Sequence, residues 1–450
     1  MRIALVSREY PPFFGGGIGS YARHIAPALA EAGHEVHVVT QTFDETHPRF
    51  AVEGHAGRLM VHRAPCPGDP AGWTSLTMRF ATLASRIVAR LAREKRIDVV
   101  EFAECEGAGA VLTALRAAGC PIGAPTVVHL HTPTEMLFRL GSIHDKTLTA
   151  PLAAYLLSER ISIRMCDHIC APSAFIAKWA REHYELPTLP TVIPYAIEGV
   201  PPLSPPAARN RVLYVGRIEP RKGVEPLLLA WTHIAERHPA WTLRLVGRDT
   251  STAQDGRSMR AYVSSLIPES LRSRVEFVDA LPPESLHREY AEASICVIPS
   301  LWENFPNTCI EALSHARPVV VSDRGGMMEM VGDTDAGLSF ASGDHIDLGR
   351  TLDRMMSESP DRLAARGMRG RRRIAQMCDK SAVVAARIRM YERAVADTEP
   401  RRSRPTPDRV TARLALWRQM RDAAGGNLDT LDLPSLPETM SRWLTPGAAA

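Results

Sequence analysis

Residues 211–249 read "RVLYVGRIEPRKGVEPLLLAWTHIAERHPAWTLRLVGRD", two short apolar runs joined by a longer segment. The runs "RVLYVGR" (211–217) and "TLRLVGR" (242–248) are rich in residues that favour strands, and the segment between them is helical in character. Strands that alternate with helices pair in parallel through right-handed crossovers. This stretch therefore predicts one strand-helix-strand unit of a parallel α/β sheet that is buried on both faces.

The same rhythm continues on both sides of this unit. Further runs of this kind are "RIALVS" (2–7), "HEVHVVT" (34–40), "DVVEFAE" (98–104), "TVVHLH" (126–131), "VEFVDAL" (275–281), "ICVIPS" (295–300) and "PVVVSD" (318–323). The set is interrupted once, by the Pro-rich segment "IPYAIEGVPPLSPPAARN" (193–210), whose prolines remove backbone donors and keep the chain extended. We therefore expect two α/β domains joined by a hinge.

The composition shifts give the expected boundaries. A first Rossmann-like domain is predicted for 1–198 and a second for 199–378, followed by a closing helix at 379–396 that packs back across both. The Pro- and Arg-rich stretch 397–450 is interpreted as a peripheral tail. The arginine-rich run at 366–373 is interpreted as a solvated face rather than an anion site.

Charge and cysteine content exclude some classes of protein. The chain has 450 residues, and 54 Lys plus Arg against 50 Asp plus Glu leave a net charge of +4, too small to indicate nucleic-acid binding. Its eight cysteines form no CxxC pair, which favours reduced thiols over a zinc site. The start "MRIALVSREYPP" fits neither a signal peptide nor a membrane span. We expect a cytoplasmic protein, with peripheral contact to the inner face of a membrane left open.

A glycine-rich loop follows the first predicted strand. Gly16, Gly17 and Gly19 precede a helical pattern, and glycines at a helix start let a phosphate or a sugar hydroxyl approach the backbone donors. A flexible turn is the simpler interpretation, and a dinucleotide-binding fingerprint is another. That fingerprint requires its glycines directly after the strand, whereas seven residues separate Ser7 from Gly15 here. Binding of NAD is therefore disfavoured.

Two acids and two cations lie near other predicted strand ends. In "WENFPNTCIEA" (302–312), Glu303 precedes an apparent helix and Glu311 is expected about two turns inside it. Arg217 ends a strand and Lys222 precedes a helix, positions suited to a diphosphate leaving group. Each of the four also has a plain structural interpretation, as an end charge, a solvated residue or a member of a salt bridge. Paired acids would suit a glycosidase as well, but acids that bracket a helix start beside cations favour donor binding.

Five segments in order resemble one known family over roughly residues 1–395. They are "EYPP" with "GGGIGSY", "HLHTP" (129–133), "YVGRIEPRKGVEPLLLAW" (214–231), "LVGRD" (245–249) and "ENFPNTCIEA" (303–312). With these segments the chain resembles the family-4 retaining glycosyltransferases of the GT-B fold. The resemblance implies two facing Rossmann-like domains with parallel sheets.

The resemblance also implies roles for residues. Glu303 would contact sugar hydroxyls, Glu311 the ribose, and His131 the transferring sugar. The residues assigned to catalysis are His131, Arg217, Lys222 and Glu303; those assigned to donor binding are Gly17, Gly247, Asn304, Phe305, Pro306, Asn307, Thr308 and Glu311; those assigned to the acceptor are Gly16, Gly19 and Tyr21. The chain departs from the family in its hinge, where Pro194, Tyr195, Ala196 and Ile197 stand in place of an Asn-Gly pair.

The implied reaction is retaining transfer of a sugar, by expectation a hexose, from a nucleotide-diphosphate sugar to an acceptor hydroxyl in glycan or glycoconjugate biosynthesis. The acceptor would be a glycan, a lipid-linked sugar or a small molecule. We expect no cofactor and no metal, because no DxD-type site stands out. The alternatives are a non-catalytic nucleotide-sugar binding module and another GT-B reaction, such as sugar-nucleotide hydrolysis or phosphorolysis. The nucleotide, the sugar, the linkage and the oligomeric state are not specified by the sequence.

Overall fold

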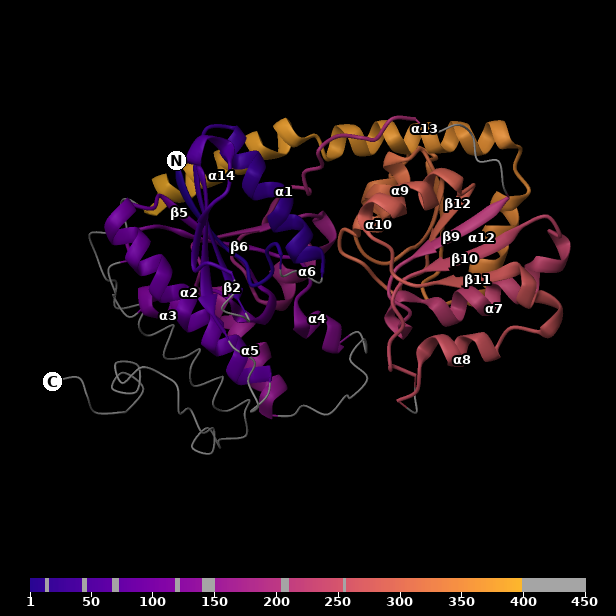
Figure 1. The fold of residues 1–450 in the computed structure, drawn as a ribbon, viewed down its shortest axis with the longest axis horizontal. Helices are drawn as coiled ribbons and strands as arrows, with labels where there is room; N and C mark the ends of the chain where they lie inside the picture. The colour runs from indigo at the N-terminus through magenta and orange to yellow at the C-terminus, as the bar shows by residue number, and fades with distance from the viewer. Residues whose placement is uncertain are drawn as a thin grey trace.

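The chain folds into two α/β domains, seen side by side in Figure 1. The computed structural model describes residues 1–12, 16–42, 47–66, 73–117, 122–139, 150–203, 210–253 and 256–398. Gly15 and all of the expected tail beyond residue 398 lie outside this description. The prediction of two domains with parallel sheets is confirmed.

The first domain is built on an eight-stranded sheet with the order β3-β4-β2-β1-β5-β6-β7-β8. Its pairs are parallel, except that the edge strand β3 runs antiparallel to β4. The strands are β1 (Arg2–Val6), β2 (Glu35–Thr42), β3 (Phe50–Val52), β4 (Leu59–Pro65), β5 (Val99–Ala103), β6 (Thr126–His129), β7 (His168–Ala171) and β8 (Thr191–Val192). The helices are α1 (Gly17–Glu31), α2 (Trp73–Lys95), α3 (Ala110–Ala117), α4 (Thr134–Arg139), α5 (Ala150–Met165) and α6 (Ala174–His183).

The second domain is built on a six-stranded sheet with the order β11-β10-β9-β12-β13-β14, in which each described pair is parallel. The strands are β9 (Arg211–Val215), β10 (Thr242–Val246), β11 (Val275–Val278), β12 (Ile295–Ile298), β13 (Val319–Ser322) and β14 (Gly337–Phe340). The helices are α7 (Val224–Ile234), α8 (Met259–Ser265), α9 (Pro283–Glu292), α10 (Asn307–Ser314), α11 (Met327–Val331), α12 (His345–Met356) and α13 (Pro360–Met377). Helices cover both faces of each sheet, and apolar residues of the strands form much of the buried core on both faces.

The last two helices lie end to end along the top of Figure 1 and pass from the second domain to the first. Helix α13 packs on α10 and α11, whereas α14 (Lys380–Thr398) packs on α1, β5 and β6. Arg387 of α14 is fully buried and pairs with the buried Glu101 of β5, which also accepts hydrogen bonds from Tyr21 and Tyr391. The closing helix expected at 379–396 is thus α14, which packs on the first domain, while the preceding α13 packs on the second.

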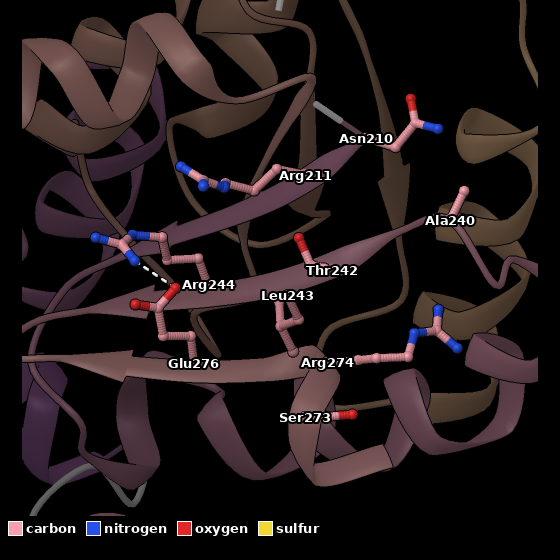
Figure 2. A pocket seen from close by; sticks show the side chains of 9 residues that line it. All are labelled: Asn210, Arg211, Ala240, Thr242, Leu243, Arg244, Ser273, Arg274 and Glu276. Atoms are coloured by element: carbon pink, nitrogen blue, oxygen red, sulfur yellow. Dashed lines mark ion pairs between the residues drawn. The ribbon is translucent and has the colours of Figure 1, made fainter. Parts of the chain in front are cut away.

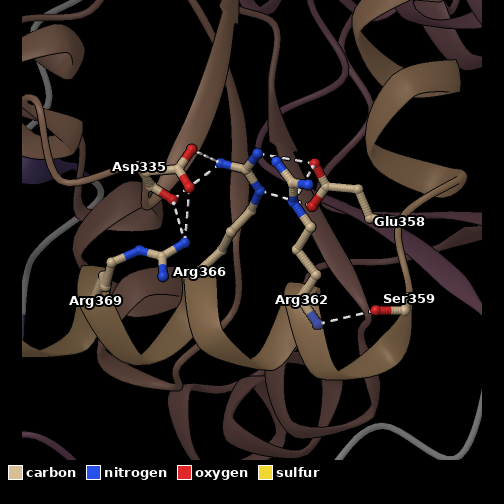
Figure 3. A network of polar contacts seen from close by, with 6 residues as sticks. All are labelled: Asp335, Glu358, Ser359, Arg362, Arg366 and Arg369. Carbon is tan, nitrogen blue, oxygen red and sulfur yellow. Dashed lines mark hydrogen bonds and ion pairs between the residues drawn. The ribbon is translucent and has the colours of Figure 1, made fainter.

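The arginine run at 366–373 is partly internal, which corrects its interpretation as a solvated face. Figure 3 shows Arg366 of α13 between Glu358 and Asp335, and its side chain is only 1% exposed. Arg369 pairs with Asp335 as well. A buried guanidinium is tolerated when carboxylates accept hydrogen bonds from its N–H groups. Both carboxylates lie outside residues 366–373, so this run alone does not indicate that Arg366 is buried.

Candidate active site

A cleft of about 920 Å³ lies between the two domains, beyond the carboxyl ends of their strands. Open α/β sheets bind their ligands at this edge. The first domain and the connecting segment contribute Glu9, Gly16, Gly17, Ile18, Cys105, Glu106, His131, Thr132, Thr134, Leu137, Leu152, Tyr155 and Tyr195. The second domain contributes Gly216, Arg217, Arg221, Lys222, Glu303, Asn304, Phe305, Pro306, Asn307 and Thr308. The structure thus places all four residues that the sequence assigned to catalysis on facing walls of one cleft.

Charged side chains concentrate on the second-domain wall. Glu303, which follows β12, forms ion pairs with Lys222 and with Arg221, whose Nη1 lies 3.2 Å from Oε1 of Glu303. Burial opposes ionisation of Glu303, but the two cations outweigh it and lower its pKa to about 2. Arg217 is more open: its side chain is 49% exposed, and its guanidinium lies 3.2 Å from Glu219. Glu303 is therefore a carboxylate at any physiological pH.

The backbone of Glu303 is held by the turn that follows β13. The N–H of Gly326 donates to the carbonyl oxygen of Glu303 at 2.9 Å. Gly325 adopts a φ of +98°, and a Cβ on it would lie 1.8 Å from the same oxygen. A glycine is therefore required at this position, both for its conformation and for the close approach. This contact fixes where Glu303 enters the cleft.

Glu311 occupies a different environment. Helix α10 begins at Asn307, so Glu311 lies about one turn inside it rather than two. The Tyr290 hydroxyl donates to Glu311 at 2.7 Å, and burial raises the pKa of the Glu311 carboxyl. Glu311 does not belong to the residues that line the cleft.

The low pKa of Glu303 bears on the alternative reaction of a glycosidase, which needs one carboxylic acid that donates a proton. An acid with a pKa near 2 is unsuited to donate a proton, so Glu303 does not fit this role.

Asn304 links the two domains. Its side-chain amide donates to the carbonyl oxygen of His131, and its Oδ1 accepts from the Ser173 hydroxyl at 2.6 Å. A second link between the domains is made by Glu329 of α11, whose carboxylate accepts hydrogen bonds from two backbone N–H groups at the start of α6, at 2.8 and 2.7 Å. The side chain of Asn304 is only 2% exposed, so both ends of the amide are engaged by the first domain rather than presented to a donor. This departs from its expected role in donor binding.

On the first-domain wall, His131 follows β6 and is buried. Its Nδ1 lies 2.8 Å from the hydroxyl of Tyr195. Burial, with the Arg387 cation beneath the site, lowers the pKa of His131 to about 3, so the imidazole is neutral. Tyr21 packs its ring 5.0 Å from that of His131 and bonds to Glu101. Tyr21 therefore supports His131 from below and does not line the cleft, contrary to its expected contact with the acceptor.

The glycine loop contributes two of its predicted residues to the cleft. Gly16 and Gly17 line it, whereas Gly19 is buried and its N–H donates to the carboxylate of Glu9 at 3.2 Å. A carboxylate of the protein itself thus sits at the start of α1. This disfavours a phosphate there and leaves the Glu9 oxygens as acceptors for hydroxyl groups.

Gly247 has a packing role instead of the predicted place at the donor. A Cβ at this position would lie 1.8 Å from the carbonyl oxygen of Gly216. These two glycines directly follow the paired strands β9 and β10, so a side chain at Gly247 would push the chain apart at the end of both strands. Gly216 lines the cleft and Gly247 does not.

Comparisons with known proteins agree with this geometry. The family described as "Glycosyl transferases group 1" matches residues 201–373, and that described as "Glycosyl transferase 4-like domain" matches residues 16–196. The chain belongs to the family-4 glycosyltransferases of the GT-B fold. Together the two matches span the two domains of this glycosyltransferase, one on each side of the connecting segment.

Named relatives of this glycosyltransferase act on different substrates. A glycogen synthase of Mycobacterium tuberculosis is 28% identical over 87% of this chain and 94% of its own length. An MMP alpha-(1->4)-mannosyltransferase of Mycolicibacterium hassiacum is 27% identical over 88% of this chain and 99% of its own length. The structure of a sucrose-phosphate synthase from Thermosynechococcus elongatus superposes with a TM-score of 0.70 at 22% identity, covering 88% of this chain and 99% of that one. The last likeness supports the fold.

Twelve of the residues that line the cleft of this glycosyltransferase were not predicted from the sequence, and four of them carry polar groups that matter for the chemistry. Arg221 was passed over beside Lys222. Glu9, Tyr195 and Glu106 were not assigned to the site either. Glu106 pairs with Arg8, and burial raises its pKa to about 7. It lies just past the carboxyl end of β5, a position that could have marked it in the same way as His131 after β6.

A second cavity, of about 490 Å³, lies at the opposite, amino ends of β9, β10 and β11. Figure 2 shows Arg211, Arg244 and Arg274 around it. Arg211 and Arg244 pair with carboxylates, and Arg274 donates to backbone carbonyl oxygens. The cations of this cavity are thus already paired with carboxylates or bonded to carbonyl oxygens, and the cavity lies at the amino edge of the sheet, where a Rossmann-type domain does not bind its nucleotide.

Among the described residues, none of the helices combines the length and hydropathy of a membrane span.

Proposed function

We propose that this protein is a retaining hexosyltransferase that moves a sugar from a nucleoside-diphosphate sugar to a hydroxyl of a glycan or glycoconjugate acceptor. The observation that carries the proposal is the cleft itself, in which Lys222, Arg217 and Glu303 of one domain face His131 of the other. Cations on the donor wall and hydroxyl-binding groups on the opposite wall suit a substrate with a charged leaving group and an uncharged reacting sugar.

The cations have a defined task in this reaction. As the bond between the sugar and the diphosphate breaks, negative charge develops on the departing phosphate oxygen. Two unit charges about 4 Å apart attract by about 4 kcal/mol at an effective dielectric constant near 20. Lys222, with a side chain only 20% exposed, acts in a less screened environment than Arg217. The cations supply the stabilisation that a divalent metal provides elsewhere, and we propose that the reaction proceeds without one.

The proposed chemistry is a displacement on one face of the sugar. The bond from the anomeric carbon to the phosphate oxygen breaks, and a bond from the same carbon to the acceptor oxygen forms. The proton of the acceptor hydroxyl moves to the departing phosphate oxygen, so no carboxylate of the protein needs to accept it. The permanently ionised Glu303 instead accepts hydrogen bonds from hydroxyls of the sugar. Glu311 is not among the cleft-lining residues, but it lies one turn inside the helix that begins at the cleft-lining Asn307, and we assign it the ribose.

A donor screen followed by product analysis tests the proposal. Thermal shift with UDP-, GDP- and ADP-sugars should identify one nucleotide that raises the unfolding midpoint, since a ligand that binds the native state stabilises it. With that donor and a panel of glycan acceptors, NMR of the product should show the same anomeric configuration as the donor, and activity should persist with a chelator.

Three outcomes would contradict the proposal. They are the absence of stabilisation by every nucleotide sugar, an inverted product, and a loss on chelation that magnesium or manganese restores. A matched control for the cations is Arg237→Ala, because Arg237 is 59% exposed and pairs with Asp353 away from the cleft.

A further inference from the structure

Tyr195 stands between the two domains on the segment that connects them. Its hydroxyl lies 2.8 Å from Nδ1 of His131, and its ring lies edge-on to Phe305 of the second domain, with the centroids 5.4 Å apart. The side chain is 8% exposed and lines the cleft. It occupies the part of the hinge in which the family resemblance leads one to expect an Asn-Gly pair. The family motif therefore does not supply the residue that contacts His131 here.

The hydrogen bond between Tyr195 and His131 has a preferred direction. A neutral imidazole carries one N–H and one acceptor nitrogen, and the bond made by one nitrogen decides the state of the other. Within the described part of the chain, the hydroxyl of Tyr195 has this one hydrogen bond. If Nδ1 donated, the buried O–H of Tyr195 would be left without an acceptor, at a cost comparable to a lost hydrogen bond. Donation from Tyr195 to Nδ1 avoids that cost.

The other nitrogen of His131 is then a donor. Nε2 is buried and has no hydrogen-bond partner among the described residues. Nδ1 is bound to Tyr195, so Nε2 is the ring nitrogen that remains available for a hydrogen bond to a ligand of the cleft that His131 lines. We propose that Tyr195 is a positioning residue that fixes His131 as the Nε2–H tautomer, so that its imidazole donates a hydrogen bond to an oxygen of the transferring sugar. The sugar half of this statement rests on the proposed function, whereas the tautomer does not.

The tautomer can be measured without any substrate. Long-range proton–nitrogen NMR correlations on protein labelled with ¹⁵N-histidine distinguish protonated from unprotonated ring nitrogens, and His131→Gln assigns the signals. We expect an unprotonated Nδ1 and a protonated Nε2 in the wild-type protein. Tyr195→Phe, which keeps the ring against Phe305, should yield a mixture of tautomers. A protonated Nδ1 in the wild-type protein, or a tautomer unchanged in Tyr195→Phe, overturns the proposal.

Kinetics then test whether the tautomer matters. The free energy of one hydrogen bond corresponds to a change of about 3- to 10-fold in a rate constant. Tyr195→Phe should therefore lower kcat by about 3- to 10-fold, with little change in the KM for donor. In a His131→Ala background the same substitution should have no further effect, because Tyr195 acts through His131. An equal loss in both backgrounds overturns the assignment.

The matched control is Tyr391→Phe, which removes another buried tyrosine hydroxyl of the first-domain core that bonds to Glu101. Its kcat should stay at the wild-type value, and a loss equal to that of Tyr195→Phe would mean that general destabilisation explains both. If the tautomer is as stated but no nucleotide sugar is turned over, the proposed function fails and the assignment of the tautomer stands.

Discussion

The side-chain amide of Asn304 donates to the backbone carbonyl oxygen of His131, across the boundary between the domains. Asn304 follows Glu303 on the second-domain wall of the cleft, and this hydrogen bond ties it to His131 on the first-domain wall. The two walls are held in register by a hydrogen bond rather than by packing alone. Because buried polar groups lose more when left unpaired than they gain when paired, this bond favours the arrangement of the two domains that the structure shows.

Asn304→Asp should weaken that link while keeping the size of the side chain. A carboxylate has no N–H to donate and would face the His131 carbonyl oxygen, at a cost of about 1–3 kcal/mol. We expect a fall in kcat of about 10- to 100-fold and a larger radius of gyration in X-ray scattering with donor bound. Asn210→Asp, at the second cavity, is the control. An unchanged kcat in Asn304→Asp would show that the arrangement of the two domains during turnover does not depend on this hydrogen bond.

The two predicted cations should contribute unequally. Lys222 is mostly buried against Glu303, whereas Arg217 is half exposed and its field is screened by water. Lys222→Ala should lower kcat by roughly two to three orders of magnitude, the range for loss of one preorganised group that stabilises charge. Arg217→Ala should cost about one order of magnitude. Steady-state kinetics at saturating acceptor measure both, and an effect on KM alone would refute the role in the transition state.

Glu311 should affect donor affinity more than turnover. Its proposed contact with the ribose is made before and during the reaction alike, so its loss raises the KM for donor and leaves kcat nearly constant. Glu311→Gln keeps an oxygen that can accept from Tyr290 and is preferred to alanine for this reason. We expect a rise in KM of about tenfold. A variant that binds donor normally but has lost turnover would restore the interpretation of paired catalytic acids.

The sequence sufficed to predict the fold class because strand runs of β-branched residues repeat in both domains. Five strands were not predicted. Four of them are short, namely β3, β7, β8 and β14, and the fifth, β4, reads "LMVHRAP", in which His62, Arg63 and Pro65 interrupt the apolar run. Strand ends located Glu303, Arg217 and His131 on the cleft because the carboxyl ends of parallel strands meet at one edge.

Partners across long separations could not be predicted. The contact between Asn304 and Ser173 joins residues 131 positions apart and depends on how the domains face each other. Arg366 looked solvated because its run contains only like charges, whereas its partners lie elsewhere in the chain. Gly247 matched a motif, but the motif does not distinguish a glycine that meets a ligand from one that lets two strands approach.

Glu104 should make stability depend on pH. This buried carboxyl accepts from the N–H of His131 at 2.8 Å, and burial raises its pKa to about 7 from an ordinary value of 4.5. Between these values the native state binds more protons than the unfolded state, so the stabilisation is complete below about pH 4.5 and is lost as the pH rises through 7. The shift corresponds to about 3 kcal/mol.

Glu104→Gln removes this titration. In the difference between the free energies of unfolding of the variant and of the wild-type protein, the contributions of the other titrating groups cancel. Urea unfolding at about pH 5 and about pH 8 should show that the variant gains stability relative to the wild-type protein as the pH rises. The control is Glu269→Gln, a carboxylate whose side chain is 90% exposed. A difference between Glu104→Gln and wild type that stays constant with pH would mean that the pKa of Glu104 in the folded protein is not raised into this range, and would contradict the prediction.

The closing helix should be part of the first domain's core rather than a removable strap. Arg387 and Glu101 are both buried, and Arg387→Met would leave the Glu101 carboxylate without its cation, at a cost of about 3–5 kcal/mol. Glu101→Gln in the same chain should recover much of that loss, because the neutral amide no longer needs a counter-ion. Lys380→Ala serves as the control on the same helix: its partners Glu31 and Glu198 are exposed, so the change should cost less than about 1 kcal/mol. Urea unfolding of the three variants gives the comparison. If Arg387→Met were no more destabilised than Lys380→Ala, α14 would contribute little to the folded first domain, and the buried cation beneath His131 would have to be there for another reason, such as the low pKa of that imidazole.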